Sequence, residues 1–236
     1  MTPSAYSAHV SPSTLSQALD PRWLEGAASS VLSGPVGRWR EPVLLAGGWY
    51  THLAVGRLPR DLDLFCTGRD HLEATTEHLV ARGARVIEDR PPFYRRHLWS
   101  GQVIDLVYNV WSRTLEDLFR RFDLGLSMVG VKWLEGKARA AAHPLALRSA
   151  RDDVVYVSPS CPNTKYTLVI IERARRYAAR LGLGVDEARI AWLWSLFSAA
   201  TPDERERMLQ RYRAVGVIET DVEAQALALM SEGDPQ

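Results

Sequence analysis

Cysteine and lysine are both scarce in this sequence of 236 residues. The only cysteines are Cys66 and Cys161, which are too few for a disulfide framework or for a zinc site built from cysteines. Such a composition is typical of a reducing compartment, and we expect a cytoplasmic protein. Lysine occurs only as Lys132, Lys137 and Lys165, so arginine supplies almost all of the positive charge.

Long hydrophobic runs and a strong net charge are also absent. The most apolar late segment, residues 188–200, is too short to span a bilayer and contains Arg189. Residues 1–20 show no basic segment followed by an apolar core, so we expect no secretory signal. The formal net charge of +1 gives no general attraction to nucleic acid or membrane. We therefore expect no membrane partner, and the composition fixes no oligomeric state.

The composition that remains is that of an ordinary globular protein, 46% hydrophobic and 24% charged. Strand and helix signals alternate in the first part of the chain, whereas helical periods alone continue from residue 162 onward. We expect an α/β (α+β) fold, a mixed β-sheet flanked by helices and followed by a small all-helical C-terminal domain. The predicted domains are an N-terminal helical extension at 1–35, a catalytic domain at 36–145 and a helical domain at 160–236.

Local signals predict the individual elements. Strands are expected at the Asp61 segment and at residues 43–46, 85–88, 94–99, 102–107 and 123–133. The Ser100-Gly101 pair predicts a tight turn between the strands at 94–99 and 102–107. Helices are expected at residues 13–19, 21–32, 49–55, 69–82, 115–121, 166–181, 185–199, 202–215 and 220–230.

Two aspartates one residue apart, Asp61 and Asp63, come after a glycine pair, Gly47 and Gly48, that ends the apolar run at 43–46. Residues i and i+2 of a strand point to the same face, so the two carboxylates should converge. Mg²⁺ is commonly held by one or two carboxylates together with substrate phosphates. Glycine lets a backbone turn approach phosphates closely. The order therefore predicts a phosphate cradle followed by a metal-binding strand.

A third acidic residue, Asp105, stands alone among apolar neighbours in the strand expected at 102–107. A lone carboxylate is costly to bury, so it should lie at a strand end, pair with a cation or bind metal. If its strand lies beside that of Asp61 and Asp63, the three carboxylates can hold two divalent ions about 3.5 to 4 Å apart. Glu88 and Asp89 are alternatives for the third position.

Residues 47–63, GGWYTHLAVGRLPRDLD, resemble the signature of the DNA polymerase β-type nucleotidyltransferase superfamily. The glycine-to-aspartate spacing and the pair Gly56-Arg57 resemble the head domain of tRNA nucleotidyltransferases and poly(A) polymerases. The similarity extends over residues 40–135. Two family features differ: Thr51-His52 replaces the usual Arg-Asp after the glycine pair, and the base-selecting Glu-Asp-x-x-Arg motif is missing after the catalytic stretch.

The resemblance implies transfer of a nucleoside monophosphate from a nucleoside triphosphate, such as ATP, to an acceptor hydroxyl. It also implies that Gly47 and Gly48 hold the donor phosphates, and that Asp61, Asp63 and Asp105 are catalytic and ligate Mg²⁺, with Mn²⁺ as an alternative. Asp105 would further act as the base, or orient the base, toward the acceptor. These roles make the chain a metal-dependent transferase with nucleotide binding.

Further residues fit this interpretation with alternatives open. Arg57 and Arg60 are suited to bind a triphosphate. The alternative is that both are ordinary solvated loop residues. Arg95, Arg96 and His97 could serve the acceptor, although a basic edge strand is the simpler account. In the later helices, a basic helix that could contact RNA is predicted from Lys165, Arg173, Arg175, Arg176 and Arg180. A helix core is the expected place of Trp192, Trp194 and Phe197.

The acceptor divides the functional hypotheses. The motif similarity favours an RNA acceptor, in particular a tRNA 3′ end. A protein or small-molecule hydroxyl, as in toxin-type or antibiotic-modifying nucleotidyltransferases, is the alternative within the same chemistry. A catalytically silent module that binds nucleotide or RNA is the alternative outside it.

Overall fold

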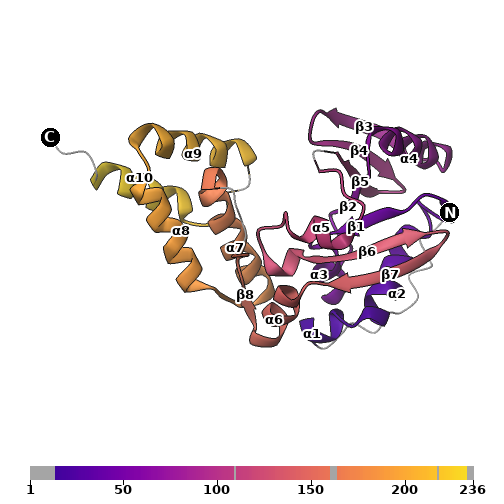
Figure 1. Cartoon of the computed structure of the whole chain (residues 1–236), viewed down its shortest axis with the longest axis horizontal. Coiled ribbons are helices and arrows are strands. Elements are labelled where there is room, and N and C mark those ends of the chain that lie inside the picture. The colour runs from indigo at the N-terminus through magenta and orange to yellow at the C-terminus, as the bar shows by residue number, and fades with distance from the viewer. Residues whose placement is uncertain (1–13, 109, 160–163, 217, 233–236) are drawn as a thin grey trace. The chain divides into compact units, whose positions relative to one another are not determined.

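The computed structural model describes residues 14–108, 110–159, 164–216 and 218–232. Its contacts divide the chain into two compact units, each of which is described by itself. The first contains residues 1–120 and 127–147, and the second contains residues 121–126 and 148–236. Figure 1 gives the elements of both. None of the helices within the described ranges is long and apolar enough to cross a membrane.

A seven-stranded mixed sheet forms the centre of the first unit, as expected for the α/β class. Its spatial order is β3-β4-β5-β2-β1-β6-β7. The strands are β1 (Val43–Ala46), β2 (Asp61–Phe65), β3 (Arg85–Arg90), β4 (Tyr94–Trp99), β5 (Gln102–Val107), β6 (Val129–Leu134) and β7 (Lys137–Ala142). Only β2 and β5 pair in parallel, and the other neighbours are antiparallel.

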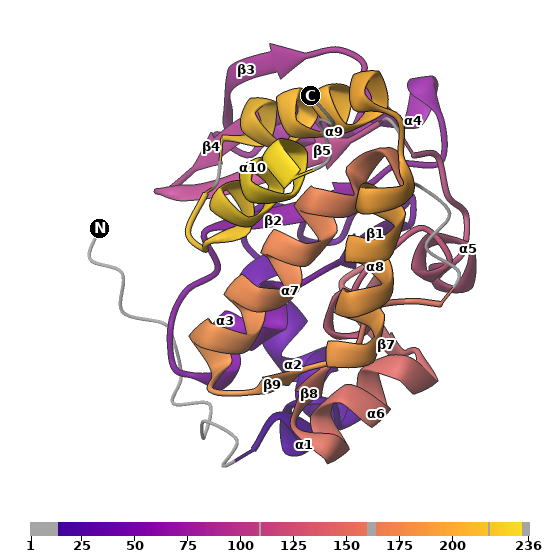
Figure 2. The same cartoon turned by 90° about the vertical axis from the view of Figure 1, so that its left-hand side faces the viewer.

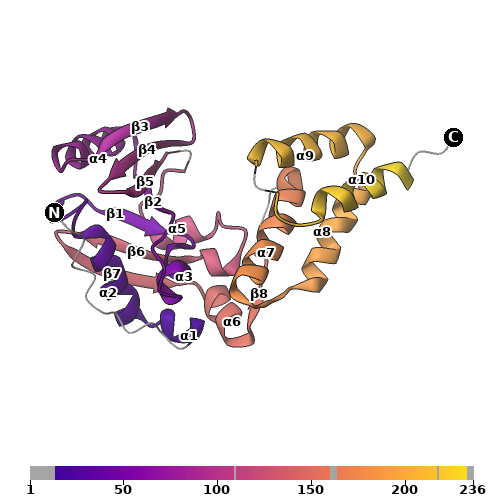
Figure 3. The same cartoon turned by 180° about the vertical axis from the view of Figure 1, so that it is seen from behind.

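Helices of the first unit pack against this sheet. They are α1 (Leu15–Ala18), α2 (Pro21–Leu32), α3 (Trp49–Ala54), α4 (Arg69–Ala81) and α5 (Leu115–Phe119). The Asp20 carboxylate caps α2 by accepting from the Arg22 and Trp23 amides, and Pro21 occupies the first turn. Helix α2 runs beside β7, which Figure 3 shows from behind. Ser13, the first residue of the helix expected at 13–19, lies outside the described residues.

One predicted strand in the middle of the chain was wrong in its bounds, and two elements were not predicted. The strand expected at 123–133 is divided into a 3₁₀ turn at Gly125–Ser127 and strand β6. Two elements without a prediction follow: strand β7 and helix α6 (Pro144–Asp152). The alanine-rich sequence of β7 contains no β-branched or aromatic residue, and it becomes a strand because β6 pairs with it from Val129 to Leu134.

The second unit consists mainly of helices around α7 (Thr167–Leu181), as Figure 2 shows. The others are α8 (Glu187–Ala199), α9 (Pro202–Val215) and α10 (Val222–Glu232). Their apolar faces share one core that includes Ile171, Phe197 and Leu209. A two-stranded parallel ladder of β8 (Val154–Val155) and β9 (Gly184–Val185) corrects the prediction that strands end before residue 162.

The two contact units divide the chain differently from the predicted domains. The described part of the segment expected as an N-terminal extension belongs to the sheet unit. Residues 121–126 belong to the helical unit, because Leu124 and Leu126 are buried in its core. Arg173 of α7 also donates to the Asp123 carboxylate at 2.6 Å. The helical unit therefore takes a segment that precedes β6 in the chain.

A buried glutamate, Glu172, joins three parts of the helical unit. Only 2% of its surface is exposed. Its carboxylate accepts from the Tyr212 hydroxyl at 2.8 Å, the Glu219 amide at 2.9 Å and the Thr220 hydroxyl at 2.5 Å. The carboxylate thus links α7 to α9 and to the loop before α10. Burial, and then the bond to Glu172, raises the pKa of Tyr212.

Glu172→Ala should lower the free energy of unfolding by about 3 kcal/mol, because it leaves several buried donors without an acceptor. Glu172→Gln keeps one acceptor oxygen and should cost less. Denaturant unfolding of the full chain, followed by tryptophan fluorescence, measures both. The exposed Glu187→Ala is the matched control and should change stability by less than about 0.5 kcal/mol. Equal losses for Glu172→Ala and the control would contradict the linking role.

Candidate active site

The glycine turn after β1 is shaped by a backbone conformation that side chains rarely adopt. Gly47 has φ +104°, and its amide donates to the Val129 carbonyl of β6. Gly48 caps the following helix α3 with φ −83°. The Thr51 hydroxyl donates to the Gly48 carbonyl at 2.7 Å and so holds the turn against the helix. Of these two positions, only that of Gly47 has a backbone angle that requires glycine.

Asp61 and Asp63 lie on strand β2 as the sequence predicts. The alternate residues Leu62 and Leu64 are completely buried, so the two aspartates share the opposite face. Asp61 is exposed and Asp63 half-buried. A Cβ atom on Gly47 would lie 3.7 Å from Oδ2 of Asp63, which places that carboxylate directly against the glycine turn. The predicted cradle and the predicted aspartate strand therefore meet.

Asp105 lies on β5, the parallel neighbour of β2, and is the register partner of Asp63. Neighbouring strands are about 4.8 Å apart, so the two aspartates are adjacent on one face. Glu88 and Asp89 are on β3, which two strands separate from β2, and the Asp89 carboxylate accepts hydrogen bonds from Arg95 and Tyr108. Among the three candidates for the third carboxylate, the topology brings Asp105 to the aspartate pair.

Arg96 of β4 holds the Asp105 carboxylate from the other side. Its Nε and Nη2 atoms donate to Oδ1 and Oδ2, each at 2.8 Å. Only 4% of Asp105 is exposed, so this paired bond compensates for a buried charge. The prediction that residues 95–97 belong to an edge strand was wrong, because β4 lies between β3 and β5. Sequence reasoning therefore missed Arg96 as the partner of Asp105.

The charges of the site act on one another. Burial among protein atoms raises the pKa of Asp61, although its side chain is exposed by surface area, and the negative charge of Asp105 raises it further. Arg96 and then His52 oppose these effects. His52 on α3 stands where the resembling family has an acidic residue. The bond to Asp105 in turn raises the pKa of Arg96, which keeps it cationic.

The donor chemistry of Asp61 and Asp63 fits a hard divalent cation. They offer two carboxylates on one strand face, next to a glycine turn. Within the described residues, however, no three His, Cys, Asp or Glu side chains form a group arranged to hold a metal ion. Both oxygens of the third carboxylate are bonded to Arg96. The metal-binding role of all three aspartates stays a prediction.

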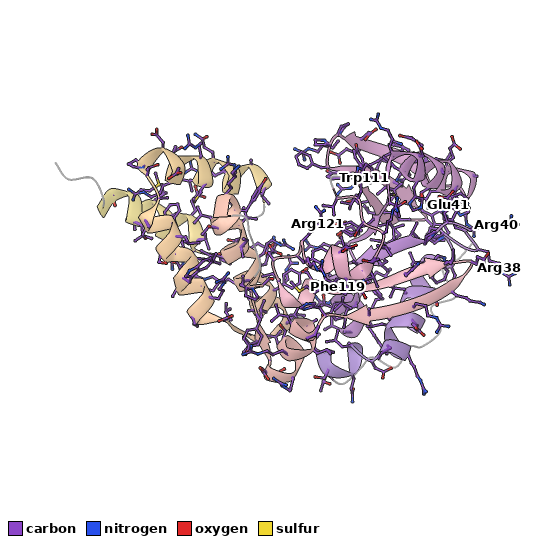
Figure 4. The ribbon with its side chains drawn as sticks, viewed as in Figure 1. Arg38, Arg40, Glu41, Trp111, Phe119 and Arg121 are labelled. Carbon is purple, nitrogen blue, oxygen red and sulfur yellow. The ribbon has the colours of Figure 1, made fainter. Side chains whose placement is uncertain are left out.

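Two other predicted binding residues lie in the loop before β2. Arg57 and Arg60 are exposed in the loop that leads to β2, and triphosphate binding by either stays a prediction. Figure 4 labels Arg38, Arg40 and Glu41, which precede β1 and so lie at the end of that strand opposite from Gly47. Because β1 and β2 are antiparallel, these charged residues lie toward the end of β2 that is away from Asp61 and Asp63.

The basic helix expected at 166–181 is helix α7, and most of its arginines have acidic partners. Arg175 donates to Asp221 and Arg180 to Glu219, in addition to the bond from Arg173 to Asp123. These partners reduce the positive charge that α7 can offer to a polyanion. The aromatic prediction for α8 holds for Phe197, which is fully buried. It was wrong for Trp192, which is 39% exposed and lies under the Arg189 guanidinium.

Solved structures that this chain resembles include a tRNA-processing enzyme, a tRNA nucleotidyltransferase and a CCA-adding enzyme. A tRNA-processing enzyme in its second apo form matches 81% of the chain at 20% identity and TM-score 0.55, over 55% of its own length. A tRNA nucleotidyltransferase in complex with a primer tRNA and an incoming ATP analogue matches 81% at 19% identity and TM-score 0.55, over 57% of its length. A CCA-adding enzyme matches 80% at 18% identity and TM-score 0.54, over 49% of its length.

The chain thus spans about half the length of these solved structures. No protein-family model and no curated protein matches it. The comparison confirms the nucleotidyltransferase fold that the motif similarity implies. At this level of identity the likeness concerns the fold alone.

Gly47→Ala should lower the free energy of unfolding by about 1–2 kcal/mol, because alanine at φ +104° is strained. Gly48→Ala is the matched control, since φ −83° is accessible to alanine. Chemical denaturation of both variants measures the difference. A Gly48 variant as unstable as the Gly47 variant would show that the turn is not limited by this one backbone angle.

Proposed function

We propose that the protein is a metal-dependent nucleotidyltransferase that moves a nucleoside monophosphate from a nucleoside triphosphate to an acceptor hydroxyl, with release of pyrophosphate. The observation that carries the proposal is the contact between the glycine turn and the aspartate strand: the Gly47 Cβ position lies 3.7 Å from Asp63 Oδ2. A phosphate that approaches the turn therefore also approaches a carboxylate able to hold its counter-ion.

Asp61 and Asp63 are the residues that would hold Mg²⁺, or Mn²⁺ in its place. A bound ion would neutralise the triphosphate oxygens and stabilise the charge that develops on the leaving pyrophosphate. The glycine turn gives the phosphates room next to the backbone, and Arg57 and Arg60 are suited to bind them from the exposed loop. The role of Asp105 as a base, or as a group that orients one, belongs to the same proposal.

For the acceptor we propose RNA, in particular a tRNA 3′ end, in the cytoplasm. The support is the fold shared with enzymes whose structures contain primer tRNA, an ATP analogue or CTP. The second candidate acceptor is a hydroxyl of a protein or a small molecule. It is favoured by the ion pairs of Arg173, Arg175 and Arg180, which reduce the charge available for an RNA backbone.

Each of the four labelled nucleoside triphosphates should be incubated with the protein, Mg²⁺ or Mn²⁺, and one acceptor class at a time. Total tRNA, total protein and a set of small hydroxylated compounds are the three classes. We expect label in tRNA from at least one triphosphate. Label in protein or small molecules alone would overturn the RNA acceptor and retain the transfer chemistry. Triphosphate binding without transfer to any class would identify a silent binding module.

Asp61→Asn and Asp63→Asn should each reduce the transfer rate by at least about a hundredfold, because each removes a negatively charged oxygen ligand worth several kcal/mol. Initial rates under saturating triphosphate measure the loss. Asp70→Asn is the matched control, since Asp70 is an exposed aspartate in the first turn of α4. Transfer at the original rate in both site variants would refute the assignment of these aspartates.

A further inference from the structure

The third aspartate of the site is already neutralised by a residue of the protein. Both oxygens of Asp105 accept a hydrogen bond from the Arg96 guanidinium, each at 2.8 Å. A paired bond of this kind fixes the orientation of both groups as well as their charge. Because arginine stays protonated in proteins, the positive charge beside Asp105 is permanent.

Arg96 is itself held in place. Its Nη1 atom lies 3.4 Å from Oε2 of Glu88, and its guanidinium lies over the Tyr94 ring at 4.8 Å. The Tyr94 hydroxyl donates to the same Glu88 oxygen at 3.1 Å. Three strands thus contribute to one network, with Glu88 on β3, Tyr94 and Arg96 on β4, and Asp105 on β5. The guanidinium is therefore a built component of the site.

A divalent ion bridging Asp63 and Asp105 would have to bind next to this guanidinium. Like charges at such short range repel strongly where water is scarce, and Asp105 is 4% exposed. The ion would also compete for oxygens that already take part in short bonds to Arg96. Asp61 and Asp63 lie on the strand face next to the glycine turn, where Asp61 is exposed and Asp63 half-buried.

From this arrangement we propose that the site binds a single divalent ion, on Asp61 and Asp63, and that Arg96 provides beside Asp105 the positive charge that a second ion would supply. Arg96 is then a positioning residue that acts through Asp105 and sets the metal stoichiometry. This inference rests on the proposed function for the identity of the ligand, a metal-bound nucleoside triphosphate.

The test measures metal stoichiometry in the full chain. The probe is Mn²⁺ with an ATP analogue that cannot be cleaved between its α- and β-phosphates. Equilibrium dialysis gives Mn²⁺ per bound analogue, and electron paramagnetic resonance detects the magnetic coupling of two ions about 3.5 to 4 Å apart. For the unaltered protein we expect about one Mn²⁺ per bound analogue and no coupled pair. Two ions with a coupled spectrum, or no bound ion, would overturn the inference.

Variants of the ion pair sharpen the test. Arg96→Met frees the Asp105 oxygens, and we expect about one additional Mn²⁺ and a coupled spectrum. Arg96→Lys keeps a positive charge and should remain at one ion. If Arg96→Met does not fold, Asp105→Asn is decisive, because a residue that is not a ligand should leave the Mn²⁺ count unchanged. Loss of Mn²⁺ in Asp105→Asn, or an unchanged count in a folded Arg96→Met, would overturn the proposal.

The same preparations separate this inference from the proposed function. Two coupled Mn²⁺ ions in a protein that transfers label would overturn the single-ion site and retain the nucleotidyltransferase. One Mn²⁺ per bound analogue in a protein that transfers to no acceptor would retain the single-ion site and overturn the transfer.

Discussion

The site depends on the one parallel pairing in the sheet, between β2 and β5. An antiparallel pair can be joined by a short turn, whereas a parallel pair needs a crossover, and here the crossover contains helix α4 and the strands β3 and β4. The pairing sets Asp63 beside Asp105. Like charges directly opposite each other on adjacent strands destabilise a sheet, so Asp63 and Asp105 require a cation nearby. The position of Arg96 follows from this constraint.

Part of the site could be predicted from the sequence, and one further part was accessible to the same reasoning. The strands at 94–99 and 102–107 and the two-residue turn between them were predicted and are confirmed. In a hairpin with such a turn, Trp99 faces Gln102, and counting back along both strands sets Arg96 opposite Asp105. A buried acid opposite an arginine is a pairing signal. The interpretation of β4 as an edge strand concealed it.

The remaining features depend on contacts that no local pattern contains. The parallel register of β2 and β5 joins residues about forty positions apart, and nothing in either strand specifies which neighbour it takes. Strand β7 has four alanines and no β-branched or aromatic residue, so its pairing with β6 and its contact with α2 define it. Residues 121–126 join the helical unit through Leu124 and Leu126, although the chain returns to the sheet directly afterwards. Tertiary contacts override local sequence at all three places.

Two buried carboxylates of this protein, Glu172 and Asp105, differ in the kind of partner that holds them. Glu172 is bonded by neutral donors, two hydroxyls and one amide, which join α7 to α9 and the loop before α10. Asp105 is bonded by a cation, and the sheet surrounds that pair with further acids, Glu88 on one side and Asp63 on the other.

Neutral donors satisfy the lone pairs of a carboxylate, and those of Glu172 all belong to the packing of its own unit. A cation instead adds a positive charge beside these acids. Burial and then the negative charge of Asp105 raise the pKa of Asp61, and the charge of Arg96 opposes them. The charge of Asp105 beside Asp61, next to the glycine turn, distinguishes this end of β2 from an ordinary strand end.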